Sequence, residues 1–145
     1  MSLSPSRAAR AAADITRAQV EKGDGGRSAL RTVGFVVWLL LWSMVVAASL
    51  GPVAESVPGT DKLHHFLAYG ALAGTALLFA RSPVGLIAAA IGTVLASGAI
   101  EILQGYVPNR QPDVADLAAN GVGAAFGLAI ALAILLVRRR RSQSA

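Results

Sequence analysis

The sequence predicts an all-α protein: an integral membrane bundle of four transmembrane helices with both termini in the cytoplasm. Of its 145 residues, 54% are hydrophobic and only 14% are charged, and the mean hydropathy is +0.58. Soluble domains do not have this composition. The apolar residues form four long runs, and basic residues cluster on alternate sides of these runs. The chain has no cysteine, which excludes a disulfide framework or a thiolate metal site.

The leading segment, residues 1–31, is expected to be a flexible basic tail on the cytoplasmic side. Its Ala- and Arg-rich stretch favours a helix, but the sequence Gly23-Asp24-Gly25-Gly26 is expected to break any helix that begins there. A membrane domain is predicted over residues 32–137, followed by a second basic cytoplasmic tail over residues 138–145.

The first apolar run, residues 33–50, is expected to be an uncleaved span. Ala47-Ala48-Ser49 resembles a signal-peptide cleavage region, but the run exceeds the usual h-region of roughly 7–15 residues, and about 30 residues precede it. The other runs cover residues 66–80, 84–103 and 117–137. A bilayer core of roughly 30 Å needs about 20 helical residues. The second run reaches this length only if its first turn, from Lys62, lies in the headgroup region.

The second helix is expected to begin at Thr60 or Asp61, either of which would be a good N-cap after Pro58-Gly59. His65 lies one helical turn after Asp61 and shares its face, so the carboxylate could orient the imidazole. Capping explains Asp61 without any ligand. Interfacial packing, with Tyr69 as a neighbour, is an alternative explanation for the histidines.

Polar residues also mark the third and fourth helices where they face the same side of the membrane. Glu101 lies about one turn before the third run ends, and an ionisable residue there suggests a functional site. Gln104 would share its face. Asp113 is the expected N-cap of the fourth helix after Pro112, with Asp116 in its first turn and Asn120 a turn further in.

Charge asymmetry predicts the orientation. Eleven of the 13 basic residues lie in the leading segment, at Arg81 and in Arg138-Arg139-Arg140-Arg141, which places that side in the cytoplasm. The other side holds five of the eight acids and only two basic residues, Lys62 and Arg110. The pairs Gly70-xxx-Gly74 and Gly123-xxx-Gly127 let helices approach closely, and we expect them to pack helices within one bundle.

These placements predict one outward-facing polar pocket at the non-cytoplasmic end of the bundle. Its candidate ligand-binding residues are Asp61, Lys62, His65, Glu101, Gln104, Arg110, Asp113, Asp116 and Asn120.

The chain resembles the VanZ-like membrane proteins, named for a factor in glycopeptide (teicoplanin) resistance. The resemblance covers roughly residues 33 to 137. It rests on four motifs in order: Asp61-Lys62-x-x-His65-Phe66-x-x-Tyr69, Glu101-x-x-Gln104, Arg110-x-x-Asp113-x-x-Asp116 and Asn120-x-x-Gly123-x-x-x-Gly127. The resemblance implies a bacterial cytoplasmic membrane protein, linked in some members to glycopeptide susceptibility.

We therefore expect the pocket to bind a cell-envelope lipid headgroup, such as that of a cell-wall precursor or another anionic lipid, or a glycopeptide-related ligand. Lys62 and Arg110 would hold a phosphate or carboxylate, while the acids and Asn120 would form hydrogen bonds with sugar hydroxyls or amides of the ligand. No cofactor, resident metal or nucleic-acid partner is expected. Three alternatives stay open: a hydrolase or transferase using His65 with an acid as acid–base pair or metal ligands, a small transporter or proton relay, and a purely structural polar cluster.

Overall fold

The computed structural model describes residues 7–51, 60–108 and 113–144, and the regular elements within these ranges are all helical. The prediction of an all-α protein is confirmed. The elements are α1 (Arg7–Leu50), α2 (Thr60–Thr75), the short 3-10 helix η1 (Ala76–Leu78), α3 (Pro83–Gln104) and α4 (Val114–Gln143).

Three helices of the described chain, and not the predicted four, are long and apolar enough to cross a membrane: Ser28–Leu50 of α1, and all of α3 and α4. The second predicted span, residues 66–80, is not among them. α2 has 16 residues and gives way to η1 instead of continuing to Ala80 as an α-helix. Thr75 donates its hydroxyl to the Ala71 carbonyl at 2.7 Å, a bond that competes with the helix ladder, and Gly74 before it is a weak helix former.

The predicted helix break at residues 23–26 is also wrong, because α1 runs unbroken through them. A glycine inside a helix costs only about 1 kcal/mol relative to alanine. Because helix is formed on both sides, residues 23–26 only extend an existing helix. They do not have to nucleate one, which is the unfavourable step in helix formation. The flexible character expected of residues 1–31 stays a prediction.

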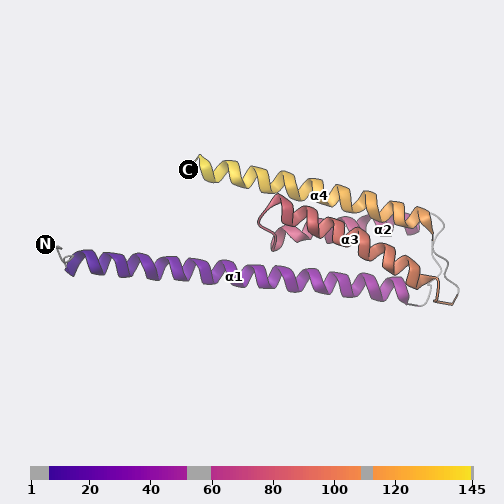
Figure 1. Ribbon diagram of the computed structural model, residues 1–145, viewed down its shortest axis with the longest axis horizontal. Coiled ribbons are helices and arrows are strands. Elements are labelled where there is room, and N and C mark those ends of the chain that lie inside the picture. Colours follow the sequence, from indigo (N-terminus) through magenta and orange to yellow (C-terminus); the bar gives the residue numbers. More distant parts are fainter. Residues whose placement is uncertain (1–6, 52–59, 109–112, 145) are drawn as a thin grey trace.

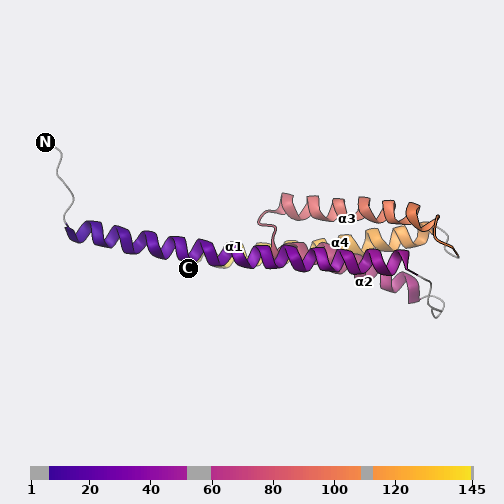
Figure 2. The same ribbon diagram turned by 90° about the horizontal axis from the view of Figure 1, so that it is seen from below.

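The helices run antiparallel to one another in chain order, so the end of α1, the start of α2, the end of α3 and the start of α4 lie together (Figure 1). The N-terminal half of α1 extends beyond the bundle, past the end at which α4 finishes (Figures 1 and 2).

Helices α2 and α4 make the closest contact in the bundle, through glycines. A Cβ added to Gly127 would overlap the backbone of Gly70, and one added to Gly123 would overlap the backbone of Phe66. Glycine at both positions is therefore what allows the two backbones to touch. Both small-residue pairs pack helices within the chain, as the sequence indicated.

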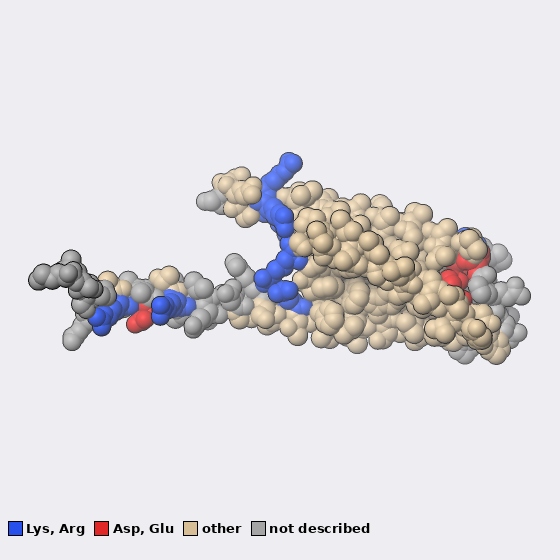
Figure 3. Space-filling view, viewed as in Figure 1, with Lys and Arg blue, Asp and Glu red and all other residues tan. Residues whose placement is uncertain are grey.

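The two ends of the bundle carry opposite charge (Figure 3). At one end, which we call the basic end, Arg31 donates from Nε to the Phe79 carbonyl at 3.3 Å and Arg139 donates from Nη2 to the Arg81 carbonyl at 2.9 Å. These bonds tie α1 and α4 to the loop around η1. Acidic residues gather at the other end, which we call the polar end. The bundle between them exposes Leu, Ile and Val side chains and buries small residues, the distribution expected of helices that face lipid.

Candidate functional site

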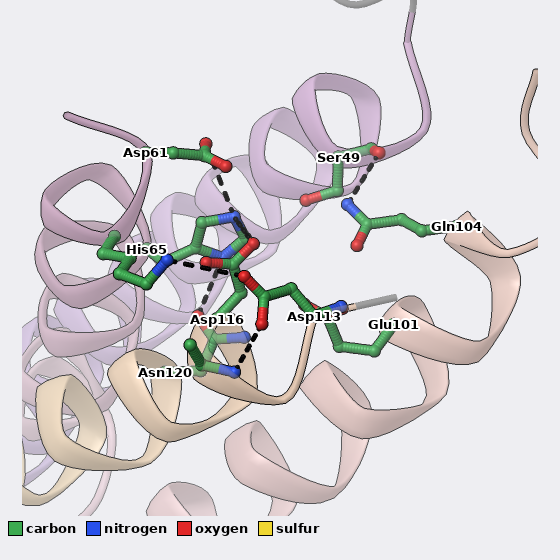
Figure 4. A network of polar contacts seen from close by, with 10 residues as sticks. Ser49, Asp61, His65, Glu101, Gln104, Asp113, Asp116 and Asn120 are labelled. Carbon is green, nitrogen blue, oxygen red and sulfur yellow. Dashed lines mark hydrogen bonds and ion pairs between the residues drawn. The ribbon is translucent and has the colours of Figure 1, made fainter. Parts of the chain in front are cut away.

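The polar end brings together side chains from α2, α3 and α4 (Figure 4). Asp61 lies in the first turn of α2, which begins at Thr60. The residues immediately before Thr60 lie outside the described part of the chain, so the N-cap at Thr60 or Asp61 stays a prediction. Asp113 is the N-cap of α4, as predicted, and its Oδ1 accepts a hydrogen bond from the Ala115 amide at 2.8 Å. The polar side chains therefore occupy helix ends, where charge and backbone polarity are compatible with an apolar bundle.

His65 lies at the centre of the first group of contacts. Its Nδ1 lies 2.9 Å from Oδ1 of Asn120, which is fully buried. With the amide oxygen of Asn120 facing the ring, Nδ1–H is the donor and Oδ1 the acceptor in this bond. The His65 ring also stacks on Tyr69, with ring centroids 6.3 Å apart. The imidazole is thus held in one orientation by a neighbour on each of two helices.

The second ring nitrogen, Nε2, faces two carboxylates. Oδ1 of Asp61 and Oδ2 of Asp116 each lie 3.8 Å from it. Asp61 is exposed, whereas only 8% of the surface of Asp116 is accessible. Two buried polar atoms in this group have no hydrogen-bond partner among the described residues: Oδ1 of Asp116 and Nδ2 of Asn120. Such atoms are costly to bury unless something else binds them.

A second group links the starts of α2 and α4 to α3. Nζ of Lys62 lies 3.4 Å from Oδ2 of Asp113, and the Asp113 amide donates to Oε2 of the buried Glu101 at 3.3 Å. Glu101 therefore holds the first residue before α4 against the last turn of α3. This contact gives Glu101 a structural role in addition to any role in binding.

The contacts of Asp113 lower the pKa of its carboxyl, through the Ala115 amide first and Lys62 next. A carboxyl group whose pKa is lower in the folded than in the unfolded protein stabilises the fold. This stabilisation is fully present above the ordinary carboxyl pKa near pH 4, and it is lost as the pH falls through the pKa of the folded protein. We expect Asp113→Asn, which can still cap the helix, to unfold at a lower temperature than wild type at pH 7. Thermal unfolding followed by circular dichroism should show this difference disappear at strongly acidic pH. A difference that persists unchanged there would assign the effect to something other than charge.

Gln104 lies apart from the histidine. Its Nε2 donates to the Ser49 carbonyl at 3.0 Å, and both residues are buried. This bond fastens the end of α3 to the end of α1. No sequence pattern could mark Ser49 as a partner, because the acceptor is its backbone carbonyl. Arg110, also a predicted pocket residue, lies outside the described residues.

A cavity of about 340 Å³ opens beside His65, between α1 and the start of α2. Its polar lining comes from Ser49, Asp61, His64 and His65, and Tyr69 lines it as well. A second cavity, of about 550 Å³, lies between α3 and α4 beside Glu101 and Asp113. The polar end therefore offers space for a ligand next to both groups of side chains.

Comparison with known proteins gives one match. A family model described as VanZ/LLP1 matches residues 29–137. No curated protein and no solved structure matches the chain. The matched range contains α2, α3, every polar-end residue described above and, except for Ser28, the part of α1 that could cross a membrane.

Proposed function

The chain belongs to the VanZ/LLP1 family, and from this membership and the polar end we propose that it is a membrane protein that binds the headgroup of a cell-envelope lipid. One observation supports this most strongly: buried Glu101, Asp116 and Asn120, from two different helices, gather at one end of an otherwise apolar bundle. Burying such groups costs free energy unless partners or a ligand offset the cost.

The proposed headgroup has both donors and an anionic group. Lys62, about half exposed, lies at the rim of the polar end and would contact a phosphate. The carboxylates and the unpartnered oxygen of Asp116 would accept hydrogen bonds from hydroxyl or amide groups. Lipid-linked cell-wall precursors carry all of these groups, as do some other anionic envelope lipids.

We further propose that the protein resides in a bacterial cytoplasmic membrane, with the basic end and both termini in the cytoplasm and the polar end outside. The arginines of the basic end support this orientation, since positively charged segments are retained on the cytoplasmic side. An outward polar end would meet precursors where glycopeptide antibiotics act. A contribution to teicoplanin resistance is the phenotype that this placement would produce.

Lipid retention tests the proposal. We expect native mass spectrometry of protein extracted from bacterial membranes to show a bound anionic lipid, identified after ejection. Lys62→Gln should retain about threefold to tenfold less of it, because a charge-assisted bond is lost at a partly exposed site. Arg140→Gln, at the far end of α4, is the matched control for loss of one positive charge. Equal retention by wild type and Lys62→Gln would contradict the proposed site.

A further inference from the structure

The polar end carries more negative charge than its described contacts neutralise. Four carboxylates lie there, on Asp61, Glu101, Asp113 and Asp116. Lys62 pairs with Asp113, and among the described residues the carboxylates beside His65 have no cationic partner other than the ring itself. An anionic headgroup approaching this end would be repelled by them.

The orientation of His65 adds to the charge imbalance at the polar end. When the proton that Asn120 faces is on Nδ1, Nε2 presents to the carboxylates of Asp61 and Asp116 either a second proton or a lone pair that can bind a cation. The three ligand atoms, one from each residue, all lie within 4.8 Å of one another. Three electron-rich atoms facing one point repel each other unless a positive charge lies between them.

Two buried atoms point independently to a missing ligand. Oδ1 of Asp116 and Nδ2 of Asn120 have no hydrogen-bond partner among the described residues, and Asn120 has no accessible surface. A water bound to a cation beside Asp116 would donate a hydrogen bond to Oδ1 of Asp116, and a headgroup oxygen would accept one from Nδ2 of Asn120. Helix packing alone does not explain why both atoms are left without partners.

We propose that Asp61, His65 and Asp116 bind a divalent transition-metal cation, for which Zn²⁺ is the natural probe. Imidazole nitrogen with carboxylate oxygen suits this class better than Mg²⁺ or Ca²⁺, which prefer oxygen ligands. Bonds of about 2.0–2.2 Å place tetrahedral ligand atoms roughly 3.4 Å apart, so the observed 3.8 Å separations need only a small contraction. Asp61 is exposed and can supply it by rotating its side chain.

Asn120 acts as a positioning residue in this site. Its Oδ1 accepts a hydrogen bond from Nδ1–H of His65, which favours the tautomer whose Nε2 can bind the metal. Metal-binding histidines commonly have such a hydrogen bond on their second ring nitrogen. Three protein ligands leave a coordination position open, and the cavity beside His65 gives access to it. The inference rests on the proposed function and adds to it, because the cation would attract the phosphate that the carboxylates repel.

Zinc binding to the purified, chelator-treated full-length protein in detergent tests the site. We expect one Zn²⁺ per chain by isothermal titration calorimetry. His65→Ala and Asp61→Asn should each weaken binding at least tenfold, and Asn120→Ala roughly 10–100-fold. Asp14→Asn is the matched control for Asp61→Asn, since it also removes one exposed carboxylate, on α1 and outside the cluster. Co²⁺ should give visible absorption bands that are lost in the His65 variant.

Several results would overturn the site: no stoichiometric zinc binding, equal binding by wild type and Asp61→Asn, or a loss in Asp14→Asn as large as that in Asp61→Asn. Because Asp61 is exposed, its variant keeps the test valid if His65→Ala does not fold, which circular dichroism would reveal. Lipid retention measured with and without chelator separates the two proposals. Retained lipid in a protein that binds no zinc in the titration refutes the metal site alone, whereas stoichiometric zinc binding by a protein that retains no lipid in either condition refutes headgroup binding alone.

Discussion

Gly127→Ala is expected to destabilise the bundle by about 3 kcal/mol, at the upper end of the usual cost of overpacking. The added methyl group would overlap the backbone of Gly70, and its next neighbour is the Gly74 amide nitrogen. Backbone cannot rotate away as a side chain can, so α2 and α4 would have to separate. Thermal or denaturant unfolding of the purified protein in detergent would measure the loss.

Gly121→Ala is the matched control, because it changes the same residue type in the same helix. A Cβ at Gly121 would meet nothing within 4 Å. Alanine should therefore be neutral there or stabilise the helix by up to about 1 kcal/mol. If both variants unfold alike, the contact between α2 and α4 does not determine the stability of the bundle.

Labelling of single introduced cysteines is expected to show which end of the bundle faces the cytoplasm, because a thiol on one side of the membrane is labelled and a thiol on the other side is not. The chain has no cysteine of its own, so each introduced thiol is unique. Tyr106 is 83% exposed in the turn after α3, at the polar end, and Ser144 is exposed beyond α4 at the basic end. A membrane-impermeant maleimide should label Tyr106→Cys in intact cells, or in spheroplasts if an outer barrier intervenes, and label Ser144→Cys only after permeabilisation.

The reverse pattern would place the polar end in the cytoplasm and remove the proposed access to envelope lipids on the outer face. Labelling of both thiols in intact cells would show that the reagent or the membrane had failed, and a cytoplasmic marker protein with a known thiol controls for this.

The sequence predicted best what depends on helical periodicity and on the cost of burying charge. His65 shares a helix face with Asp61, and Asn120 lies one turn beyond Asp116, so their depths in the bundle follow from spacing. The structure brings these four residues together at the polar end. The N-cap at Asp113 was predictable for a similar reason, since a local side-chain bond to the backbone determines it.

Other features depend on contacts between distant parts of the chain and could not be predicted. Gln104 bonds the Ser49 carbonyl, and no side-chain pattern marks a backbone acceptor 55 residues away. The length of α2 depends on where Thr75 and the glycines end the α-helical ladder, and hydropathy does not register this. The failed break at residues 23–26 shows that the cost of a few glycines is small once helix is formed on both sides.

The central claim is that the polar end binds a lipid headgroup, and an experimental structure of the protein with co-purified lipid tests it most directly. We predict a headgroup in the cavity beside His65, with its phosphate near Lys62 and its polar groups within hydrogen-bond distance of Asp116. Lipid headgroups found only at the basic end, around Arg31, Arg81 and Arg139, would contradict the claim.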